Sequence, residues 1–424
     1  MRFLVGRSSL TGSVAIPSSK SHTIRAVAIA SLAEGTSEIL HPLESEDTLS
    51  AVRLYRALGA KIVQEEDRWV VEGTAGKIKR PEDVIHIGNS GTTCRIGMGS
   101  AALGRGYTVL TGDEQSRRRP MKSLLGALAD LGAEAFSTKG DGLLPVIVGG
   151  PIKGGETAVD GVTSQFLTSL LINCPLARDD TQIHIDDLRE RPYVDMTLHW
   201  LEKQEIMPKN ENYERFIIPG GHSFRGFTER IPADFSSATF FLCAAAITNS
   251  QVLVLGLDMD DVQGDRKVVD YLVQMGADIE VTERGIRIRG SDLQGQELDL
   301  NDTPDALPAL AVVGCHAWGE TVLRNVPQAR MKETNRIAVM AQNLKCLGAD
   351  VEELPDGLLI RHSDLKGTLV DGAGDHRVVM ALAIAGLKAQ GVTRVTRAEA
   401  VNMTFPTFPH LMKELGANMR LVRG

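Results

Sequence analysis

The sequence is poor in aromatic residues, which make up only 4% of its 424 residues. Nucleic-acid surfaces that stack bases depend on such rings, and the formal net charge of −8 also disfavours a nucleic-acid or acidic-membrane partner. We therefore expect neither partner. If the chain binds anions, local clusters of cations have to act against an unfavourable overall charge.

Cysteine is scarce, and its spacing does not suit disulfides or a metal site. The five cysteines are odd in number, widely spaced and without a CxxC pair, and the ten histidines form no HExxH or HxxxH motif. These patterns predict no disulfide framework and no metal site. Small apolar neighbours around Cys243 and Cys315 predict buried thiols.

Long apolar segments and nucleotide motifs are missing as well. The longest apolar runs, such as 378–385, are far shorter than the roughly 20 residues that span a bilayer. Residues 1–7 lack the apolar core of a secretory signal, so we expect a cytoplasmic protein without a membrane partner. No GxxxxGK[ST] is present, which argues against a nucleotide P-loop.

One sequence pattern recurs about every 70 residues along the whole chain. An amphipathic run ends at a Gly-Ala pair, and two short strand-like segments follow, joined by a polar turn such as 282–285. Glycine suits the left-handed residue that ends a helix. The pairs begin at Gly59, Gly132, Gly276, Gly348 and Gly416. A degenerate copy at 200–218 fills the gap between the second and the third, so the sequence predicts six units.

A second piece precedes each ending: a strand, a polar loop and a helix of small or apolar residues. Helices such as 238–247 and 378–387 are apolar all round and should be buried. The loops contain Lys20-Ser21, Asn89-Ser90-Gly91, Thr163-Ser164-Gln165, Asp234-Phe235-Ser236, Pro304-Asp305 and Asp375-His376-Arg377. Their polar residues are either N-caps or parts of one site where the helix ends converge; for Asp234 and Ser236 both interpretations stay open.

The first of these loops shows the choice clearly. A strand-like run at 12–16 leads into a helical run at 26–32, so Lys20, Ser21 and Arg25 should lie on a loop and the first helical turns. Unpaired backbone N–H groups and the helix dipole favour an anion there. The alternative is a serine-capped helix with two solvated cations, and we assign capping to Ser18 and Ser19.

Seven cations lie in or beside the loops, more than one phosphate requires, so we expect two anionic substrates or one with several anionic groups. They are Lys20, Arg25, Arg95, Arg119, Lys332, Arg336 and Arg377. Lys332 and Arg336 are four residues apart, which predicts a shared helix face. Asp305 and Glu333 are candidates for proton transfer, although Glu333 also suits an ordinary salt bridge.

Seven motifs, in register from Gly12 to Gly416, resemble the 5-enolpyruvylshikimate-3-phosphate synthase family. They are Pro17-Ser18-Ser19-Lys20-Ser21 with Arg25, Gly88-Asn89-Ser90-Gly91-Thr92, Arg119-Pro120, Ser164-Gln165-Phe166, Asp305, Lys332-Glu333-Thr334-Asn335-Arg336 and Asp375-His376-Arg377. Any one motif is weak, but the whole set is specific.

The resemblance implies an α/β fold: a two-domain inside-out α/β barrel of six βαβαββ repeats, three per domain. A change of composition near 220–232 divides the repeats in the same way, giving lobes at 14–230 and at 1–13 plus 231–424, the N-terminal strand joining the C-terminal lobe. Sites tend to form at such domain interfaces.

The implied reaction transfers the enolpyruvyl group of phosphoenolpyruvate to the 5-hydroxyl of shikimate 3-phosphate and releases phosphate. It proceeds by addition and elimination through a tetrahedral intermediate, without a cofactor, in the shikimate pathway to chorismate and the aromatic amino acids. We expect a monomer.

The resemblance also implies a role for each matched residue. Asp305 is the expected base, and Glu333 with Lys20 protonates the methylene carbon. The residues expected to bind shikimate 3-phosphate are Lys20, Ser21, Arg25, Thr163, Ser164, Gln165, Asp305 and Lys332. The residues expected to bind phosphoenolpyruvate are Lys20, Gly91, Arg119, Gln165, Arg336 and Arg377.

The chain departs from the family pattern at three positions. Met403 stands where many members have lysine, Glu190 where many have serine, and Asn335 where aspartate is frequent. Glu190 is therefore doubtful as a phosphate ligand, and Arg191 is a possible substitute. Gly91 leaves room for the inhibitor glyphosate in this family, so we expect sensitivity.

Two alternatives are a sister enzyme on the same fold and a protein of a different class. The sister enzyme that transfers enolpyruvyl to UDP-N-acetylglucosamine uses a cysteine on a mobile loop near an Arg-Pro, whereas 116–120 here contains none. A non-catalytic anion-binding repeat scaffold would have lost Lys20, Asp305 or Glu333, and all three are present.

Overall fold

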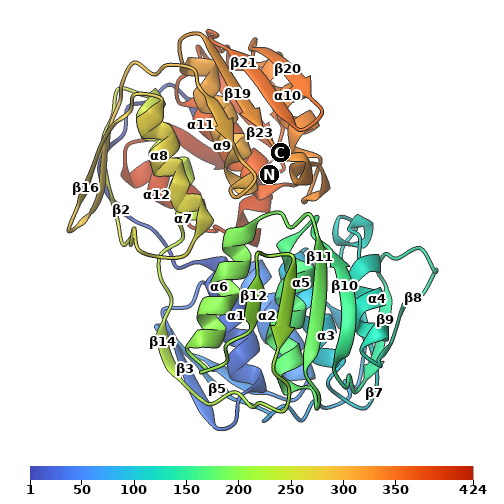
Figure 1. Cartoon of the computed structure of the whole chain (residues 1–424). Helices are drawn as coiled ribbons and strands as arrows, with labels where there is room; N and C mark the ends of the chain where they lie inside the picture. Colours follow the sequence, from blue (N-terminus) through green and yellow to red (C-terminus); the bar gives the residue numbers. More distant parts are fainter. Residues whose placement is uncertain (424) are drawn as a thin grey trace. The chain divides into compact units, whose positions relative to one another are not determined.

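The computed structural model describes residues 1–423, and the chain forms two compact units. The N unit comprises Ser18–Ile231, and the C unit comprises Met1–Pro17 together with the chain from Pro232 on. Figure 1 colours the N unit from blue to green and most of the C unit from yellow to red. Both chain ends belong to the C unit, where the first and last strands pair.

Three four-stranded sheets make up the strand content of the N unit across residues 18–231. In spatial order they are β14 (Thr228–Arg230), β3 (Thr36–Leu40), β5 (Arg68–Glu72) and β4 (Lys61–Gln64); β6 (Ile85–His86), β7 (Gly106–Thr111), β9 (Val146–Gly150) and β8 (Glu134–Ser137); and β10 (Gly155–Asp160), β11 (Thr181–Asp186), β13 (Arg215–Ile218) and β12 (Lys209–Glu211).

The C unit has three further sheets of the same size in its described residues. They are β2 (Thr11–Ala15), β15 (Gln251–Leu255), β17 (Gly285–Arg289) and β16 (Asp278–Thr282); β18 (Glu297–Asp299), β19 (Glu320–Arg324), β21 (Gly357–Arg361) and β20 (Asp350–Leu354); and β22 (Leu369–Asp371), β23 (Val392–Thr396), β1 (Arg2–Gly6) and β24 (Met419–Val422).

All six sheets share one pairing scheme. The first two strands in each are parallel, and the third and fourth join them antiparallel. Parallel neighbours need a crossover, which a helix supplies, whereas the antiparallel neighbours can follow one another through a tight turn. The six predicted repeats therefore correspond to six equivalent sheets.

Three strands pair with partners that are not their neighbours along the chain. β1 takes the third place in the last sheet, where the other sheets have the strand that ends a hairpin. β2 precedes the first helix of the N unit but pairs with β15 of the C unit, while β14 precedes α7 (Phe235–Ile247) of the C unit but pairs with β3 of the N unit. The N-terminal strand β1 therefore pairs within the C unit.

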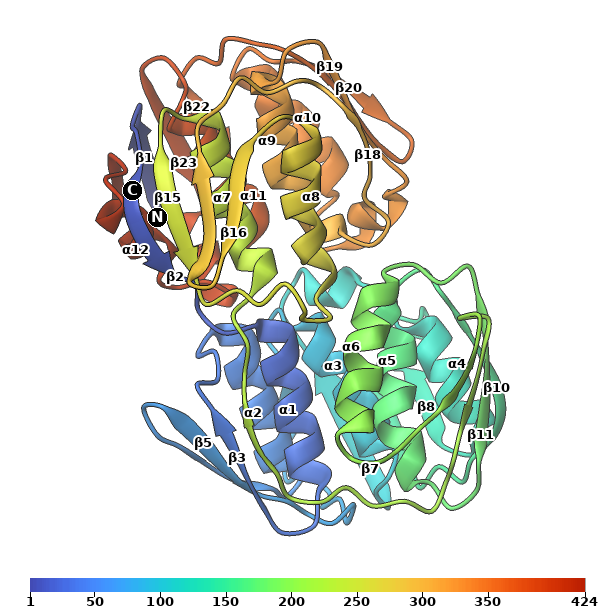
Figure 2. The ribbon, with the colours of Figure 1, turned by 60° about the vertical axis from the view of Figure 1, so that its left-hand side comes forward.

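The helices fall into two classes. One class is almost entirely buried: α1 (Lys20–Leu32), α3 (Gly91–Ala101) and α5 (Ser164–Asn173) in the N unit, and α7, α9 (Leu307–His316) and α11 (His376–Gly386) in the C unit. Members of each trio pack on one another, and Figure 2 shows α7, α9 and α11 side by side. The predicted buried helices are therefore present.

The second class is amphipathic and follows the second strand of each repeat. It comprises α2 (Glu46–Ala57), α4 (Lys122–Asp130), α6 (Arg191–Glu202), α8 (Lys267–Gln274), α10 (Arg336–Cys346) and α12 (Phe408–Glu414). The five expected glycines follow these helices with positive φ. In the degenerate copy, Glu205 takes the left-handed conformation with φ of 59° and Ile206 N donates to Leu201 O, as Ala60 N does to Tyr55 O.

The structure of residues 1–423 bears on the predictions made for the cysteines, for membrane-spanning segments and for metal sites. Cys243 and Cys315 are buried as predicted, and the five cysteines are unbridged. In this range no helix combines the length and apolar character needed to cross a membrane. The same residues contain no group of three metal-ligating side chains.

Candidate active site

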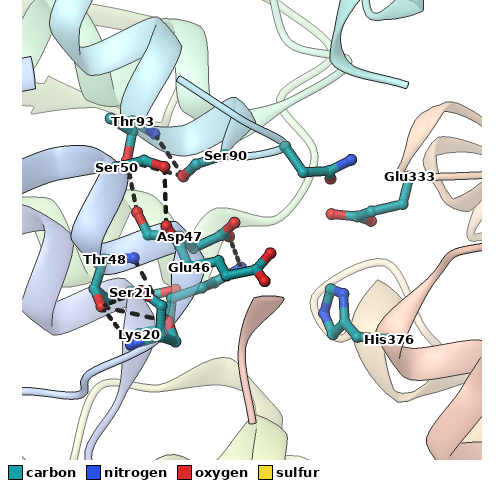
Figure 3. A network of polar contacts seen from close by, with 12 residues as sticks. Lys20, Ser21, Glu46, Asp47, Thr48, Ser50, Ser90, Thr93, Glu333 and His376 are labelled. Atoms are coloured by element: carbon teal, nitrogen blue, oxygen red, sulfur yellow. Dashed lines mark hydrogen bonds and ion pairs between the residues drawn. The ribbon is translucent and has the colours of Figure 1, made fainter. Parts of the chain in front are cut away.

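Lys20 begins α1 and is paired inside the N unit. Ser19 caps this helix as predicted, whereas the Ser18 hydroxyl donates to Ile231 O at 3.5 Å and caps nothing, so that prediction was wrong. The Lys20 Nζ lies 3.3 Å from Oδ2 of Asp47 in the first turn of α2, and 14% of the Lys20 side chain is exposed. Figure 3 shows this contact.

Asp47 also joins α3 to this group. The Thr93 hydroxyl in the first turn of α3 donates to the Asp47 carbonyl at 3.3 Å, and the Ser90 side chain caps the same helix by accepting from Thr93 N. The first turns of α1, α2 and α3 therefore meet at one place, with the Lys20 ammonium among them. The sequence predicted that the N-termini of the buried helices converge. Of these helices, the contacts above join α1 and α3 through α2, which belongs to the amphipathic class.

Gly91, the first residue of α3, lies against two guanidinium groups. A Cβ at this position would lie 2.7 Å from Arg119 Nη1 and 3.2 Å from Arg95 Nη1. Arg119 donates to Asn89 Oδ1 at 2.6 Å, and Arg95 donates to Gln165 Oε1 at 2.6 Å. Two cations next to free helix N–H groups form a site that suits a carboxylate or a phosphate.

Arg25 is 2% exposed, and most of its donors are used inside the protein. Its Nε donates to Thr197 Oγ1 at 2.9 Å, Nη1 to Ser21 O at 3.0 Å, and Nη2 to Thr168 Oγ1 at 3.3 Å and to Tyr193 O at 2.9 Å. A guanidinium has five N–H donors, so one remains for a ligand. Burial lowers the pKa of Arg25 to about 10, partly offset by Tyr193.

Thr163 and Ser164 lie at the N-terminus of α5. The Thr163 side chain caps the helix by accepting from Gln165 N. The Ser164 hydroxyl donates to Glu190 Oε2 at 2.9 Å, and its backbone N–H donates to the same oxygen at 3.3 Å. This helix start therefore already holds an anionic group, and the group belongs to one of the three residues that depart from the family pattern.

In the C unit, Arg336 binds three carboxylates. The side chain is 1% exposed; its Nη1 donates to Asp305 at 2.6 Å, its Nε to Asp375 at 2.8 Å, and its Nη2 to Glu333. Burial alone would lower the pKa of Arg336, but Asp375, Glu333 and Asp305 outweigh it and raise that pKa well above its usual value. Arg336 is charged at any ordinary pH.

Asp305 and Asp375 connect this network to α9 and α11. The second oxygen of Asp305 lies 2.9 Å from Arg377 Nη2, and Asp375 caps α11 by accepting from Arg377 N at 2.9 Å. Asp305, Glu333, Arg336 and Arg377 thus form one charged group.

The helix face predicted for Lys332 and Arg336 is wrong. Lys332 follows the 3-10 turn Pro327–Met331, and α10 begins only at Arg336. The cause is the Asn335 side chain, which caps the helix by accepting from Ala338 N at 3.1 Å. Glu333 has both features weighed at the outset: it pairs with Arg336 and lies in a charged site.

The structure adds three residues to the predicted set. Arg95, which the sequence showed only as one of the loop cations, lies beside Gly91 and donates to Gln165. Asp47 pairs with Lys20, and Asp375 pairs with Arg336. The cap position of Asp375 was visible in the sequence, but Asp47 gave no signal because an acid in the first turn of a helix is common. Asp234 is an N-cap, accepting from Ser237 N at 3.2 Å.

Comparison with known proteins agrees with this geometry. The family model described as EPSP synthase (3-phosphoshikimate 1-carboxyvinyltransferase) matches residues 4–412. The chain belongs to the EPSP synthase family. The 3-phosphoshikimate 1-carboxyvinyltransferase of Acetivibrio thermocellus is 55% identical over 419 residues, and that of Ruminiclostridium cellulolyticum is 49% identical over 418 residues; both alignments cover 99% of each chain.

More distant members of the EPSP synthase family show the same full-length agreement. The 3-phosphoshikimate 1-carboxyvinyltransferase of Methanocaldococcus jannaschii is 43% identical and covers 97% of both chains. A solved structure of EPSP synthase from Acinetobacter baumannii superposes with a TM-score of 0.85 at 28% identity over 100% of both chains. The predicted family, the transferase class and the transfer of enolpyruvyl to shikimate 3-phosphate are confirmed, and the tetrahedral intermediate stays a prediction.

The UDP-N-acetylglucosamine alternative finds no support in the cysteines. Cys94 lies inside α3, fully buried, and burial raises the pKa of its thiol to about 12. Such a thiol is neutral at pH 7 and poorly reactive.

Proposed function

We propose that this chain transfers the enolpyruvyl group of phosphoenolpyruvate to the 5-hydroxyl of shikimate 3-phosphate, with the side chains described above in divided roles. In the N unit, Ser21 and the remaining Arg25 donor bind the carboxylate side of the shikimate ring. Thr163, Ser164 and Gln165 bind at the N-terminus of α5. The dipole and free N–H groups of that helix support a phosphate there.

The observation that carries the proposal is the convergence of Arg95 and Arg119 on Gly91. Both guanidiniums lie close enough to contact a Cβ at this helix start, so an anion placed there receives backbone and side-chain donors together. We assign this place to phosphoenolpyruvate, with Lys20 and Gln165 as further ligands. Arg95 orients Gln165 through its hydrogen bond to Oε1.

The C unit supplies the two carboxylates for proton transfer and further cations. Asp305 removes the proton of the attacking hydroxyl, and Glu333 with Lys20 delivers a proton to the methylene carbon of phosphoenolpyruvate. Arg336 and Arg377 bind phosphoenolpyruvate, and Lys332 binds the 3-phosphate. Because Arg336 holds both carboxylates, it fixes the acid and the base in position.

The same proposal includes the finer description of the fold. In each unit the central helix trio is buried and the three sheets carry amphipathic helices, which supports an inside-out α/β barrel of three repeats per domain. Five of the six buried helices then carry substrate-binding loops at their N-termini, and the exception is α7, which Asp234 caps.

Phosphate release tests the assignment. Purified protein is mixed with phosphoenolpyruvate and either shikimate 3-phosphate or UDP-N-acetylglucosamine, and released phosphate is measured over time. We expect release only with shikimate 3-phosphate. Release only with the sugar nucleotide would overturn the proposed substrate.

A further inference from the structure

Glu190 is a buried carboxylate in an unusual backbone conformation. It lies just before α6, is 1% exposed, and has φ of 59° and ψ of 41°, the left-handed region that residues other than glycine rarely adopt. A buried charge and an unfavourable backbone are both costly, so such a residue persists where the surroundings hold it in place. One of its partners is Ser164 at the start of α5.

The two donors of Ser164 point at one carboxylate oxygen. The hydroxyl–Oε2 distance is 2.9 Å, and the N–Oε2 distance is 3.3 Å. A backbone N–H and a hydroxyl at a helix N-terminus are the groups that bind a phosphate oxygen, and the helix dipole favours any anion there. Glu190 therefore occupies a place with the properties of a phosphate subsite.

A phosphate cannot use these donors while Glu190 holds them. A hydroxyl has one hydrogen to donate, and the Ser164 hydroxyl donates it to Glu190. A phosphate dianion beside a buried carboxylate would also be repelled strongly, because charges interact more strongly away from water.

We propose that Glu190 is an internal anion that occupies the 3-phosphate subsite and is displaced from Ser164 when shikimate 3-phosphate binds. This inference rests on the proposed function, in which Ser164 binds the substrate phosphate. Glu190 is then a specificity-determining residue: it sets how much of the phosphate's binding free energy is spent on displacing the carboxylate. Unphosphorylated shikimate leaves Glu190 in place.

The connection to Arg25 indicates how displacement reaches the rest of the site. Arg25 binds the Tyr193 carbonyl and the Thr197 hydroxyl in α6, the helix that Glu190 precedes. The start of α6 is thus held by α1 at one point and by α5 at another. Release of Glu190 removes the link to α5 and leaves the link to Arg25.

The matched variant is Glu190→Gln, which keeps the shape and an acceptor oxygen but removes the charge. We expect calorimetric titration to show shikimate 3-phosphate binding about tenfold or more tighter than to wild type, the equivalent of one charge-assisted hydrogen bond. Shikimate affinity and the KM for phosphoenolpyruvate should stay unchanged. Asp186→Asn is the control, because it removes one exposed charge from the same segment and should change nothing.

Unchanged or weaker binding of shikimate 3-phosphate to Glu190→Gln would overturn the displacement, and so would equal tightening in Asp186→Asn or equal tightening of shikimate. If Glu190→Gln does not fold, Glu190→Ser is titrated against the same criteria. A crystal structure with shikimate 3-phosphate bound should show Glu190 beyond hydrogen-bonding distance of Ser164. Wild-type phosphate release is measured in parallel, so loss of the proposed function and loss of this inference are distinguishable.

Discussion

The guanidinium of Arg336 donates to Asp305 at 2.6 Å from a side chain that is 1% exposed. The expected general base is therefore held by a permanent positive charge that solvent does not reach. Arg377 lies 2.9 Å from the other oxygen of Asp305. These contacts fix the carboxylate in one orientation. A general base must be held within hydrogen-bonding reach of the proton that it removes.

Replacing Asp305 by asparagine should lower turnover far more than it weakens binding. The amide keeps the shape but cannot accept a proton, so we expect kcat to fall by about 100- to 10,000-fold. Steady-state phosphate release gives kcat, and titration gives the affinities of both substrates. Asp302→Asn is the control, because Asp302 pairs with Lys267 and has no proposed role. Unchanged turnover in Asp305→Asn would remove Asp305 from the mechanism.

Replacing Gly91 by alanine should weaken phosphoenolpyruvate selectively. The new methyl would lie 2.7 Å from Arg119 Nη1, so that guanidinium has to shift. Loss of one charge-assisted hydrogen bond raises the KM for phosphoenolpyruvate by about tenfold or more, with little effect on shikimate 3-phosphate. Gly126→Ala in α4 is the matched control, because a Cβ there meets no atom within 4 Å. Equal effects on the two substrates would contradict this assignment.

The space beside Gly91 also leads to a prediction about inhibition by glyphosate. The family resemblance implies that the room beside Gly91 admits glyphosate. We therefore expect wild-type phosphate release to fall in millimolar glyphosate and Gly91→Ala to be less inhibited. Full wild-type turnover at that concentration would show that the prediction is wrong.

Replacing Arg336 by methionine should destabilise the protein strongly. The change leaves Asp375, which is 0% exposed, together with Asp305 and Glu333, without their shared cation. Breaking a buried ion pair from one side typically costs about 3–5 kcal/mol. Urea unfolding measures the loss, with Arg361→Met as the control. Arg361 is 39% exposed and pairs with Glu320, so its loss should have little effect on the free energy of unfolding.

His316 should make stability fall in mild acid. Burial, together with Lys388 and His362, lowers its pKa to about 3. In the unfolded chain His316 takes up a proton near pH 6.5, whereas in the folded chain it stays neutral until about pH 3. Its contribution to the free energy of unfolding is therefore fully present above pH 6.5 and is lost as the pH falls towards 3. Between pH 6.5 and 5 the expected loss from this group is about 2 kcal/mol.

Urea unfolding of wild type and His316→Asn at pH 7 and pH 5 isolates that loss. The variant should lose about 2 kcal/mol less than wild type over this interval. His410→Asn is the control, because the His410 side chain is 72% exposed. Parallel pH profiles for wild type and His316→Asn would show that His316 does not titrate as expected.

The repeat and its endings could be predicted from sequence because their signals are local. A Gly-Ala pair after an amphipathic run fixes where a helix stops, and five such pairs have the expected left-handed glycine. The strand exchange of β2 and β14 has no local signal, since pairing with β15 or with β3 depends on the whole assembly. That part came from the family resemblance alone.

The sequence predicted which charged residues belong to the candidate site, but not which hydrogen bonds and ion pairs they form. Sequence spacing placed Lys332 and Arg336 on one helix face, and the Asn335 cap prevents it. Nothing in the spacing shows that Arg25 uses four N–H donors internally. The pairing of Glu190 with Ser164 joins loops 26 residues apart, so only the folded chain shows it.

The place of β1 in the last sheet has a consequence for synthesis. The N unit is one continuous stretch, Ser18–Ile231, and all of its strands have left the ribosome before the C unit is half made. β1 instead waits for β23 and β24, its two neighbours, which are made last. The first strand to be translated is therefore among the last to find its partners, and a chain stalled before β23 carries it as an unpaired edge open to aggregation.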